Sequence, residues 1–121
     1  MTDSVVPSGP GICVIFEGGE PVFVGKGVGR EGLRGRLRAH RATDADLTRS
    51  TLRASVAVDL LGVSRWTARQ RPGGLPEWAV ASVNEFLAAC EVAWIECDSA
   101  EGATDLKRGL LAEFRPEYNL D

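Results

Sequence analysis

Histidine, cysteine and long apolar runs are scarce in this sequence of 121 residues. A single histidine and the absence of a Cys-x-x-Cys pair argue against a zinc site. No apolar run reaches the roughly 18 residues of a membrane-spanning helix, so no membrane partner is expected. The three cysteines, Cys13, Cys90 and Cys97, lie in apolar runs, which is typical of reduced, buried thiols. Residues 1–10 lack the build of a signal peptide, and these features together predict a cytoplasmic protein.

Charge is distributed unevenly along the chain. The composition, 44% hydrophobic and 26% charged with a formal net charge of −3, is that of one soluble globular domain. Residues 26–71 contain 11 basic and 4 acidic residues, a net charge of +7, and the remainder carries −10. This asymmetry predicts a basic face for an anionic partner, with chance placement on solvated surfaces as the alternative. We expect a flexible lead-in over residues 1–10 and a single domain over residues 11–121.

Three short apolar runs predict the strands of a small sheet. Residues 12–16 and 22–24 flank Gly18 and Gly19, a pattern typical of a β-hairpin. Residues 92–97 predict a third strand much later in the chain. Because helical patterns occupy the rest of the sequence, we expect an α+β fold with a small three-stranded, mainly antiparallel sheet flanked by helices.

Helical periodicity and capping residues divide the remainder of the chain. Helices are expected over residues 31–42, 51–61, 65–69 and 99–114, with N-caps at Ser50, Ser64 and Asp98 and ends at Gly62 and Pro116. A capping box of Ser82 and Glu85 predicts a further helix to residue 90, with an earlier start near Pro76 as the alternative. A turn is expected over residues 72–74. The expected inward residues are Leu33, Leu37, His40, Leu52, Val56, Leu60 and Leu61, and the core is also expected to receive Trp66, Trp78 and Trp94.

Basic residues form a stripe on the first predicted helix. Arg34, Arg38 and Arg41 are spaced at i, i+4 and i+7, which aligns them on one face. The glycine-rich loop over residues 25–29 contains Lys26 and resembles loops that surround phosphate, although it lacks the P-loop pattern. These cations are candidates for a phosphate-binding surface, with a solvated helix face as the alternative.

Several separated motifs together resemble one family. They are Gly11-Ile12-Cys13, Phe23-Val24-Gly25, the helical segment 33–40, the segment 106–111, and Pro116-Glu117-Tyr118-Asn119. In their order and spacing these motifs are similar to those of the GIY-YIG nuclease superfamily, in particular a small stand-alone subtype. The resemblance extends over nearly the whole chain and implies metal-dependent cleavage of phosphodiester bonds in nucleic acid.

The resemblance also implies which positions carry the chemistry. The family's two strand tyrosines correspond to Cys13 and Phe23, and its metal-binding glutamate corresponds to Lys107. The helix arginine is present as Arg36, and its histidine partner is present as His40. A lysine ammonium only donates hydrogen bonds and does not ligate Mg²⁺. Cys13, in an apolar strand, is expected to be a small buried hydrophobe rather than a base.

The changed positions favour binding over catalysis. We expect a degenerate domain that binds nucleic acid or another phosphate-bearing ligand, with metal-dependent nuclease activity weak or lost and magnesium needed only if that activity is retained. The expected phosphate-binding residues are Lys26, Arg34, Arg36, Arg38, Lys107 and Asn119. A glutamate with a divalent cation carries a net charge of about +1, as a lysine does, so we hypothesise that Lys107 replaces that pair.

Three other functions fit the sequence. One is an active nuclease with an unorthodox site. Another is a protein-interaction or regulatory module that contacts its partner through the acidic C-terminal half. The last is a DNA-binding regulator, because residues 57–69 resemble a helix-turn-helix motif.

Overall fold

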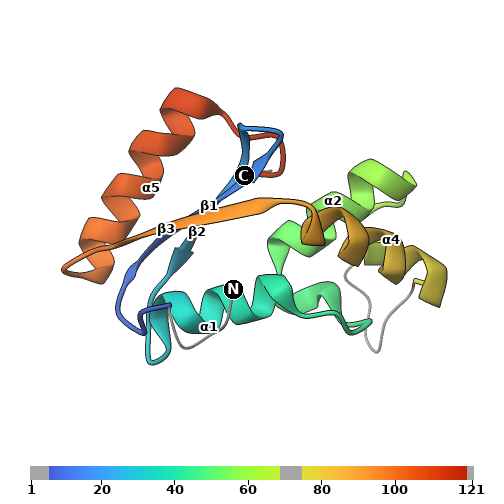
Figure 1. Ribbon diagram of the computed structural model, residues 1–121, viewed down its shortest axis with the longest axis horizontal. Helices are drawn as coiled ribbons and strands as arrows, with labels where there is room; N and C mark the ends of the chain where they lie inside the picture. Colours follow the sequence, from blue (N-terminus) through green and yellow to red (C-terminus); the bar gives the residue numbers. More distant parts are fainter. Residues whose placement is uncertain (1–5, 69–74, 120–121) are drawn as a thin grey trace.

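A three-stranded antiparallel sheet forms the centre of the molecule. The structure is a computed structural model that describes residues 6–68 and 75–119. The sheet consists of β1 (Gly11–Glu17), β2 (Glu20–Gly27) and β3 (Glu91–Glu96), in the order β2-β1-β3. Figure 1 shows α5 (Ala100–Phe114) on one side of the sheet and α1 (Gly32–Arg41) on the other. The expected α+β fold is therefore confirmed.

The hairpin of β1 and β2 turns at two glycines. Gly18 and Gly19 have φ angles of 57° and 84°, the left-handed region that the favoured two-residue hairpin turns require. This turn places Cys13 opposite Gly25 and Ile15 opposite Phe23 across the strand pair. The expected glycine turn is confirmed.

Side chains alternate between the two faces of the sheet. Cys13 packs with residues of α1 in a buried apolar cluster, whereas Lys26, one register position away and so on the other face, donates a hydrogen bond to Thr104 of α5. The α1 face and the α5 face therefore receive different residues of the same strands. This alternation decides which predicted site residues meet.

Four further helices complete the described part of the chain. They are the 3-10 helix η2 (Leu47–Arg49), α2 (Thr51–Leu61), α3 (Arg65–Ala68) and α4 (Glu77–Ala88). The Ser50 side chain accepts a hydrogen bond from the backbone N–H of Arg53, and Gly62 adopts a φ of 67°, so both predicted ends of α2 are confirmed. The helix-turn-helix-like segment spans the end of α2 and α3. Residue 69 and the predicted turn at 72–74 lie outside the described residues.

Two predicted helix starts are wrong. Helix α4 begins at Glu77 after Pro76, which is the alternative start, and the Ser82 hydroxyl donates to the carbonyl of Trp78 inside the helix at 3.0 Å. Helix α5 is capped by Ser99 instead of Asp98, because the Ser99 hydroxyl accepts from the backbone N–H of Gly102 at 3.0 Å.

Several side chains expected in the core are exposed. The end of α2 and the start of α4 lie away from the sheet in Figure 1. Leu60 is 43% exposed, Trp66 74% and Trp78 66%, whereas Trp94 packs against the cluster that contains Cys13. Cys13 is buried as expected, but Cys90 and Cys97 are only partly buried.

The N-terminal segment is part of the fold from Val6 onwards. Val6 is buried, and its carbonyl accepts from Nε of Arg34 at 2.9 Å. The backbone N–H groups of Leu33 and Arg34 donate to the carbonyls of Gly9 and Pro7. These bonds satisfy donors at the start of α1 that have no partner within the helix. The lead-in expected over residues 1–10 therefore packs on the domain in its second half, and residues 1–5 lie outside the described part.

The C-terminal end of the described chain lies along the outer edge of β2. The backbone N–H of Tyr118 donates to the carbonyl of Val22 at 2.8 Å. The side-chain oxygen of Asn119 accepts from the N–H of Val24, and its amide nitrogen donates to the carbonyl of Val24, both at 2.8 Å. We name Tyr118 and Asn119 the C-terminal clasp, because they occupy hydrogen-bonding groups that an edge strand otherwise leaves open.

A helix crosses a membrane only when it is about 20 residues long and predominantly apolar. Within residues 6–68 and 75–119, none of the helices is both long enough and apolar enough to cross a bilayer.

Replacement of Asn119 tests the clasp. Asn119→Ala is expected to lower the free energy of unfolding by about 1–3 kcal/mol, because it leaves two part-buried backbone groups of Val24 without partners. Urea denaturation followed by circular dichroism measures this change. The exposed neighbour Glu117 provides the control, and Glu117→Ala is expected to change stability by less than about 0.5 kcal/mol. Equal stability of the two variants would contradict the clasp.

Candidate functional site

Three predicted catalytic positions meet around Gly25. A Cβ atom at Gly25 would lie 2.9 Å from Cε2 of Phe23, 3.0 Å from Sγ of Cys13 and 3.4 Å from Nε2 of His40. Strand β1 supplies Cys13, strand β2 supplies Phe23, and the buried face of α1 supplies His40. Only glycine leaves room for all three, so Gly25 is the residue that permits this close packing.

His40 is a buried, neutral imidazole. Its side chain is 3% exposed, Nδ1 lies 2.6 Å from the Ser50 hydroxyl, and Nε2 has no hydrogen-bond partner. The ring packs edge-to-face on Phe23 with centroids 5.1 Å apart. Burial, together with the positive charges of Arg36 and Lys107, lowers the pKa of His40 to about 3. The imidazole is therefore uncharged at neutral pH and does not itself attract a phosphate.

Cys13 is a buried thiol, as the sequence predicts. Burial raises the pKa of Cys13 to about 11, although the charges of Arg36 and Lys107 act in the opposite direction. The thiol therefore stays protonated at neutral pH. The positive charges of Arg36 and Lys107 thus act on both Cys13 and His40.

A small hollow lies beside this cluster, at the outer edge of β2. We name it the edge hollow; its volume is about 20 Å³, and it is lined by Phe23, Thr51, Ser55, Arg65, Lys107, Tyr118 and Asn119. Side chains of β2, α2, α3 and α5 thus line the same hollow. Lys107 and Phe23, two positions that the family resemblance singles out, therefore line the same hollow next to the C-terminal clasp.

The charged residues that line the edge hollow are both cations. Lys107 and Arg65 line it, and the exposed Arg36 influences the same cluster from α1, with Nη1 3.3 Å from the carbonyl of Arg49. The carboxylate of Asp59 accepts a hydrogen bond from the hydroxyl of Tyr118, a lining residue, at 2.8 Å. Burial and this carboxylate raise the pKa of Tyr118, so the phenol remains protonated.

The donor set of the edge hollow does not suit a magnesium ion. Mg²⁺ prefers carboxylate oxygens, and the hollow is lined by two cations, hydroxyls, an amide and an aromatic ring. Within residues 6–68 and 75–119, no three His, Cys, Asp or Glu side chains are grouped as metal ligands. The ammonium group of Lys107 opposes a second cation by charge repulsion.

Three of the predicted phosphate-binding cations have structural partners elsewhere. The Nζ of Lys26 donates to the Thr104 hydroxyl at 3.0 Å on the α5 face of the sheet. Arg34 holds the N-terminal segment, and Arg38 forms an ion pair with Glu31 at 2.7 Å. Arginines of the predicted stripe on α1 therefore have different structural partners. Asn119 lines the edge hollow, but both of its amide groups bond Val24.

Sequence reasoning missed the contribution of α2 and α3 to this region. Thr51 and Ser55 are one helical turn apart on α2, and Arg65 begins α3. The basic character of residues 65–69 was visible in the sequence, but nothing in it indicated contact with residue 107. The role of Ser50 as both a helix cap and the partner of His40 also depends on the tertiary structure.

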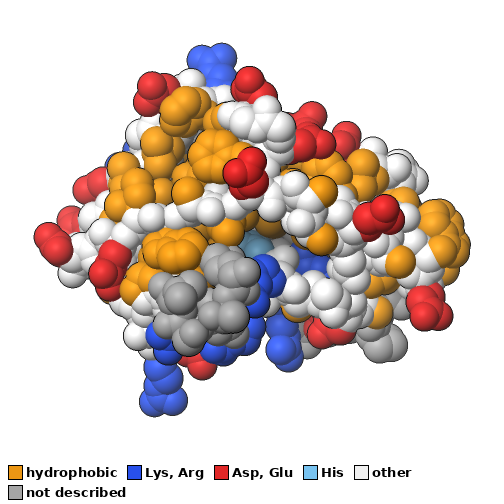
Figure 2. Space-filling model, viewed as in Figure 1, with side chains coloured by type: hydrophobic (Ala, Val, Ile, Leu, Met, Phe, Trp, Pro, Cys, Tyr) orange, Lys and Arg blue, Asp and Glu red, His pale blue; other side chains and the backbone are white. Residues whose placement is uncertain are grey.

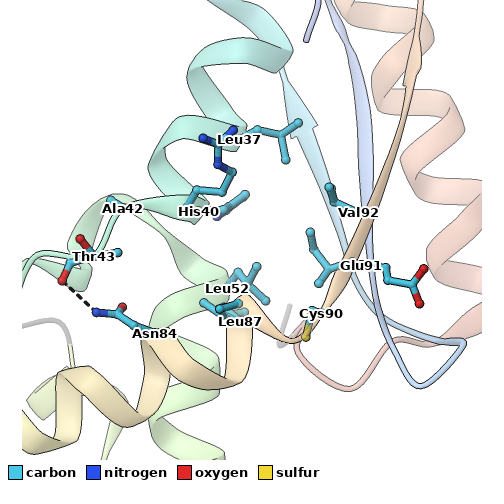
Figure 3. A pocket seen from close by; sticks show the side chains of 13 residues that line it. Leu37, His40, Ala42, Thr43, Leu52, Asn84, Leu87, Cys90, Glu91 and Val92 are labelled. Atoms are coloured by element: carbon cyan, nitrogen blue, oxygen red, sulfur yellow. Dashed lines mark hydrogen bonds between the residues drawn. The ribbon is translucent and has the colours of Figure 1, made fainter. Parts of the chain in front are cut away.

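A larger cavity lies on the other side of His40. It has a volume of about 330 Å³ and is bounded by the ends of α1 and α4 and the start of β3 (Figure 3). Its walls are largely aliphatic, with Leu37, Leu52, Leu87 and Val92 among the lining side chains. Figure 2 shows the only histidine of the chain, in pale blue, at the bottom of a depression on this face. His40 thus separates an apolar cavity from the cationic hollow.

Polar groups at the cavity are already engaged. The amide of Asn84 donates to the carbonyl of Thr43 at 2.9 Å (Figure 3), and its oxygen accepts from the buried guanidinium of Arg53 at 3.0 Å. Neither Arg36, Arg65 nor Lys107 lines this cavity. The charged residues that line this cavity are Arg41 and Glu91, whereas Lys107 and Arg65 line the edge hollow.

Comparison with solved structures identifies similar domains. The magnesium-bound GIY-YIG N-terminal endonuclease domain of UvrC from Thermotoga maritima is 20% identical with a TM-score of 0.56, and the match covers 98% of this chain and 91% of that chain. A point mutant of that domain, bound to its catalytic divalent cation, is 19% identical with a TM-score of 0.57 and the same coverage. No protein-family model and no curated protein matches the sequence.

The titration of His40 tests the electrostatics of the site. Because the chain has one histidine, its ring protons give a single pair of NMR signals. These signals are expected to keep the neutral-form chemical shift from pH 8 to pH 5, since the pKa is lowered to about 3. Lys107→Gln removes one charge that lowers this pKa, so it is expected to raise the pKa.

The same pKa has a consequence for stability. The unfolded chain binds a proton at His40 below about pH 6.5 and the folded chain does not, so stability falls as the pH drops from there toward pH 3. The slope approaches about 1.4 kcal/mol per pH unit from this group. A folded-state midpoint near the ordinary histidine value would contradict both expectations.

Proposed function

We propose that this chain, which has the GIY-YIG endonuclease fold, binds the phosphate groups of nucleic acid, or of another phosphate-bearing ligand, without cation-dependent cleavage. The observation that carries the proposal is the edge hollow, where Lys107 and Arg65 meet at the site implied by the family resemblance. Arg36 adds a third positive charge to the same side of the molecule. An anion is attracted to such a cluster without the help of a metal.

Lys107 supplies the charge that a glutamate and its divalent cation would supply together. The pair has a net charge of about +1, and so does a lysine ammonium. An ammonium group also donates hydrogen bonds directly to phosphate oxygens. Lys107 therefore supports attraction of the phosphate, while the Lewis acidity that makes a bound water nucleophilic is absent from this residue.

None of the side chains at the family's catalytic positions is suited to activate water. Phe23 has no ionisable group, and Cys13 remains a protonated thiol because its pKa is raised to about 11. His40 has a pKa lowered to about 3 and is 3% exposed, so it is a weak base that water barely reaches. General-base catalysis thus has no residue to perform it in this cluster.

The dimensions of the edge hollow favour phosphate oxygens over a whole nucleotide. A volume of about 20 Å³ is close to that needed for a single water-sized group. The hollow therefore receives one oxygen, while the rest of the ligand lies outside near the exposed Arg36 and Arg65. The hydroxyls of Thr51 and Ser55 add neutral donors at its wall.

Substitution of the cations tests binding. Lys107→Ala is expected to weaken the affinity for a DNA oligonucleotide by roughly tenfold, because one hydrogen bond to a charged group is lost. The slope of log affinity against log salt is expected to fall by about 1, and Arg36→Ala should behave similarly. Fluorescence anisotropy over a salt series, with and without chelator, measures both quantities.

A neighbouring arginine provides the matched control. Arg108 follows Lys107 on α5, is exposed, and pairs with Asp105 at 3.3 Å. Arg108→Ala removes the same charge but does not alter the edge hollow, so its effect is expected to be much smaller. Binding that disappears in chelator, or that is equally weakened by Arg108→Ala and Lys107→Ala, would contradict the proposal.

Nuclease activity is tested separately. Incubation of the protein with supercoiled plasmid and with single strands, in the presence of Mg²⁺ or Mn²⁺, is expected to give no cleavage above the chelator control. Agarose and denaturing gels detect nicking and strand cutting. Metal-dependent cleavage that is lost in Arg36→Ala would instead establish an active nuclease with an unorthodox site.

A further inference from the structure

The outer edge of β3 has no strand partner in the described part of the chain. The order β2-β1-β3 gives the sheet two outer edges, and the C-terminal clasp covers the one on β2. Within residues 6–68 and 75–119, no strand pairs with β3 on the side away from β1. This edge lies at the front of the sheet in Figure 1. The two edges therefore differ, and only the β2 edge is closed by a described segment.

The register identifies which backbone groups lie on the β3 edge. In an antiparallel pair, the hydrogen-bonding groups of successive residues point alternately toward the partner strand and away from it. The N–H of Cys97 donates to the carbonyl of Pro10 at 2.8 Å, so Cys97 and every second residue before it point toward β1. The backbone groups of Val92, Trp94 and Glu96 therefore point outward. An added strand would bond to these groups.

The sheet face beside this edge is apolar and only partly covered. Ile12 of β1 pairs with Lys26 of β2 and with Ile95 of β3, and side chains in one register row share a face. This is the face that α5 covers, because Lys26 bonds Thr104. Ile12 is fully buried, whereas Ile95 is 50% exposed and Ala93, two residues before it, is also exposed. The side chains of an added strand would cover Ala93 and Ile95.

Strand β3 lacks the devices that commonly protect an edge strand. Natural edges are often blunted by lysine, by proline or by a β-bulge, because a regular edge pairs readily with another chain. The sequence of β3 contains neither lysine nor proline, and the strand pairs with β1 in continuous register. It is therefore a regular template for a further strand.

The charge at this edge is acidic. Strand β3 begins at Glu91 and ends at Glu96, and both side chains are exposed. Residues 72–106 contain no lysine or arginine. If two copies of β3 paired antiparallel about the strand centre, Glu91 of each would lie opposite Glu96 of the other, and like charges in this position are destabilising. A strand with basic residues at these positions is attracted instead.

We propose that the outer edge of β3 binds an extended segment of another protein, with apolar side chains at alternate positions and lysine or arginine at both ends. The bound segment forms a fourth strand of the sheet. Its backbone bonds the outward groups of β3, its apolar side chains cover Ile95, and its cations lie opposite Glu91 and Glu96. The edge hollow takes no part in this interaction, which therefore stands independently of phosphate binding.

The probe is a hexapeptide with blocked ends and the sequence Lys-Val-Thr-Val-Thr-Lys. When it lies antiparallel to β3, its lysines are opposite Glu91 and Glu96 and its valines are opposite Ala93 and Ile95. A control peptide has glutamate in place of both lysines. Each peptide is titrated at low salt into the isotope-labelled protein, and the backbone amide signals are followed by two-dimensional NMR.

The lysine peptide is expected to bind and to shift the amide signals of Val92, Trp94 and Glu96 most strongly. The glutamate peptide is expected not to bind, because its charges repel those of β3. Failure of the lysine peptide to bind, equal binding of the two peptides, or shifts confined to another part of the molecule would each overturn the inference.

Reversal of the edge charges tests the electrostatic contribution. Glu91→Lys and Glu96→Lys are each expected to weaken binding of the lysine peptide roughly 2- to 30-fold, because an attractive cross-strand pair becomes a repulsive one. Glu77→Lys makes the same change in net charge at the start of α4, away from the sheet, and is expected to leave the affinity unchanged. Equal weakening by all three variants would indicate general charge attraction and contradict the inference.

N-methylation of the peptide tests the backbone contribution without altering the protein. The first threonine lies opposite Trp94 and directs its N–H toward β3, whereas the second valine lies opposite Ala93 and directs its N–H away. Methylation of the threonine nitrogen is expected to weaken binding roughly 2- to 13-fold through loss of one hydrogen bond, and methylation of the valine nitrogen to have little effect. Equal effects of the two methyl groups would rule out strand addition.

Sedimentation equilibrium distinguishes other occupants of the edge. Without peptide, the protein is expected not to self-associate through β3. A dimer that the lysine peptide dissociates would assign the edge to a second copy of the chain. Peptide binding that appears only after deletion of residues 2–5 would assign the edge to the chain's own N-terminal segment. Either result overturns the inference.

Discussion

The position of the edge hollow depends on the hydrogen bonds between Asn119 and the backbone of Val24. These two bonds, with that of Tyr118 to Val22, hold the end of the described chain against β2. The segment before them leads back to α5, so the clasp also fixes where Lys107 lies relative to the strand. Side chains from opposite faces of the sheet therefore meet at one edge. Without this closure, β2 would be an open edge strand with unpaired backbone groups.

The cations at this edge lie beside an interior cluster that carries no charge at neutral pH. Cys13, Phe23 and His40 fill the space above Gly25 without adding a charge at neutral pH. The cations therefore face a low-dielectric interior on one side and solvent on the other, which strengthens their attraction for an anion outside. Figure 2 shows blue side chains gathered in the region of α1, whereas red ones are scattered over the rest of this face.

The sequence predicted the features that local interactions determine. Glycine conformation sets the hairpin turn, and a serine hydroxyl with a following glycine sets both ends of α2, so these were predicted correctly. The predicted start of α4 and the predicted burial of Trp66 and Trp78 were wrong, because both depend on how the helices pack in the tertiary structure. The partner of Asn119 is 95 positions away in the chain, and no local pattern specifies such a contact. Cys13, Phe23 and His40, which the family resemblance assigns to its chemical positions, lie together around Gly25, but the resemblance did not indicate that Arg65 and Lys107 line the same hollow.

The close packing around Gly25 also restricts how this chain changes by mutation. The side chains of Cys13, Phe23 and His40 all lie within 3.4 Å of the position that a Cβ at Gly25 would occupy. Substitutions at contacting positions are not additive, because each alters the space available to the others. A tyrosine introduced at position 13 must displace a neighbour in this fully buried cluster, which costs stability unless a second substitution accompanies it. Substitutions at positions 13, 23 and 40 are therefore expected to be coupled in their effects on stability.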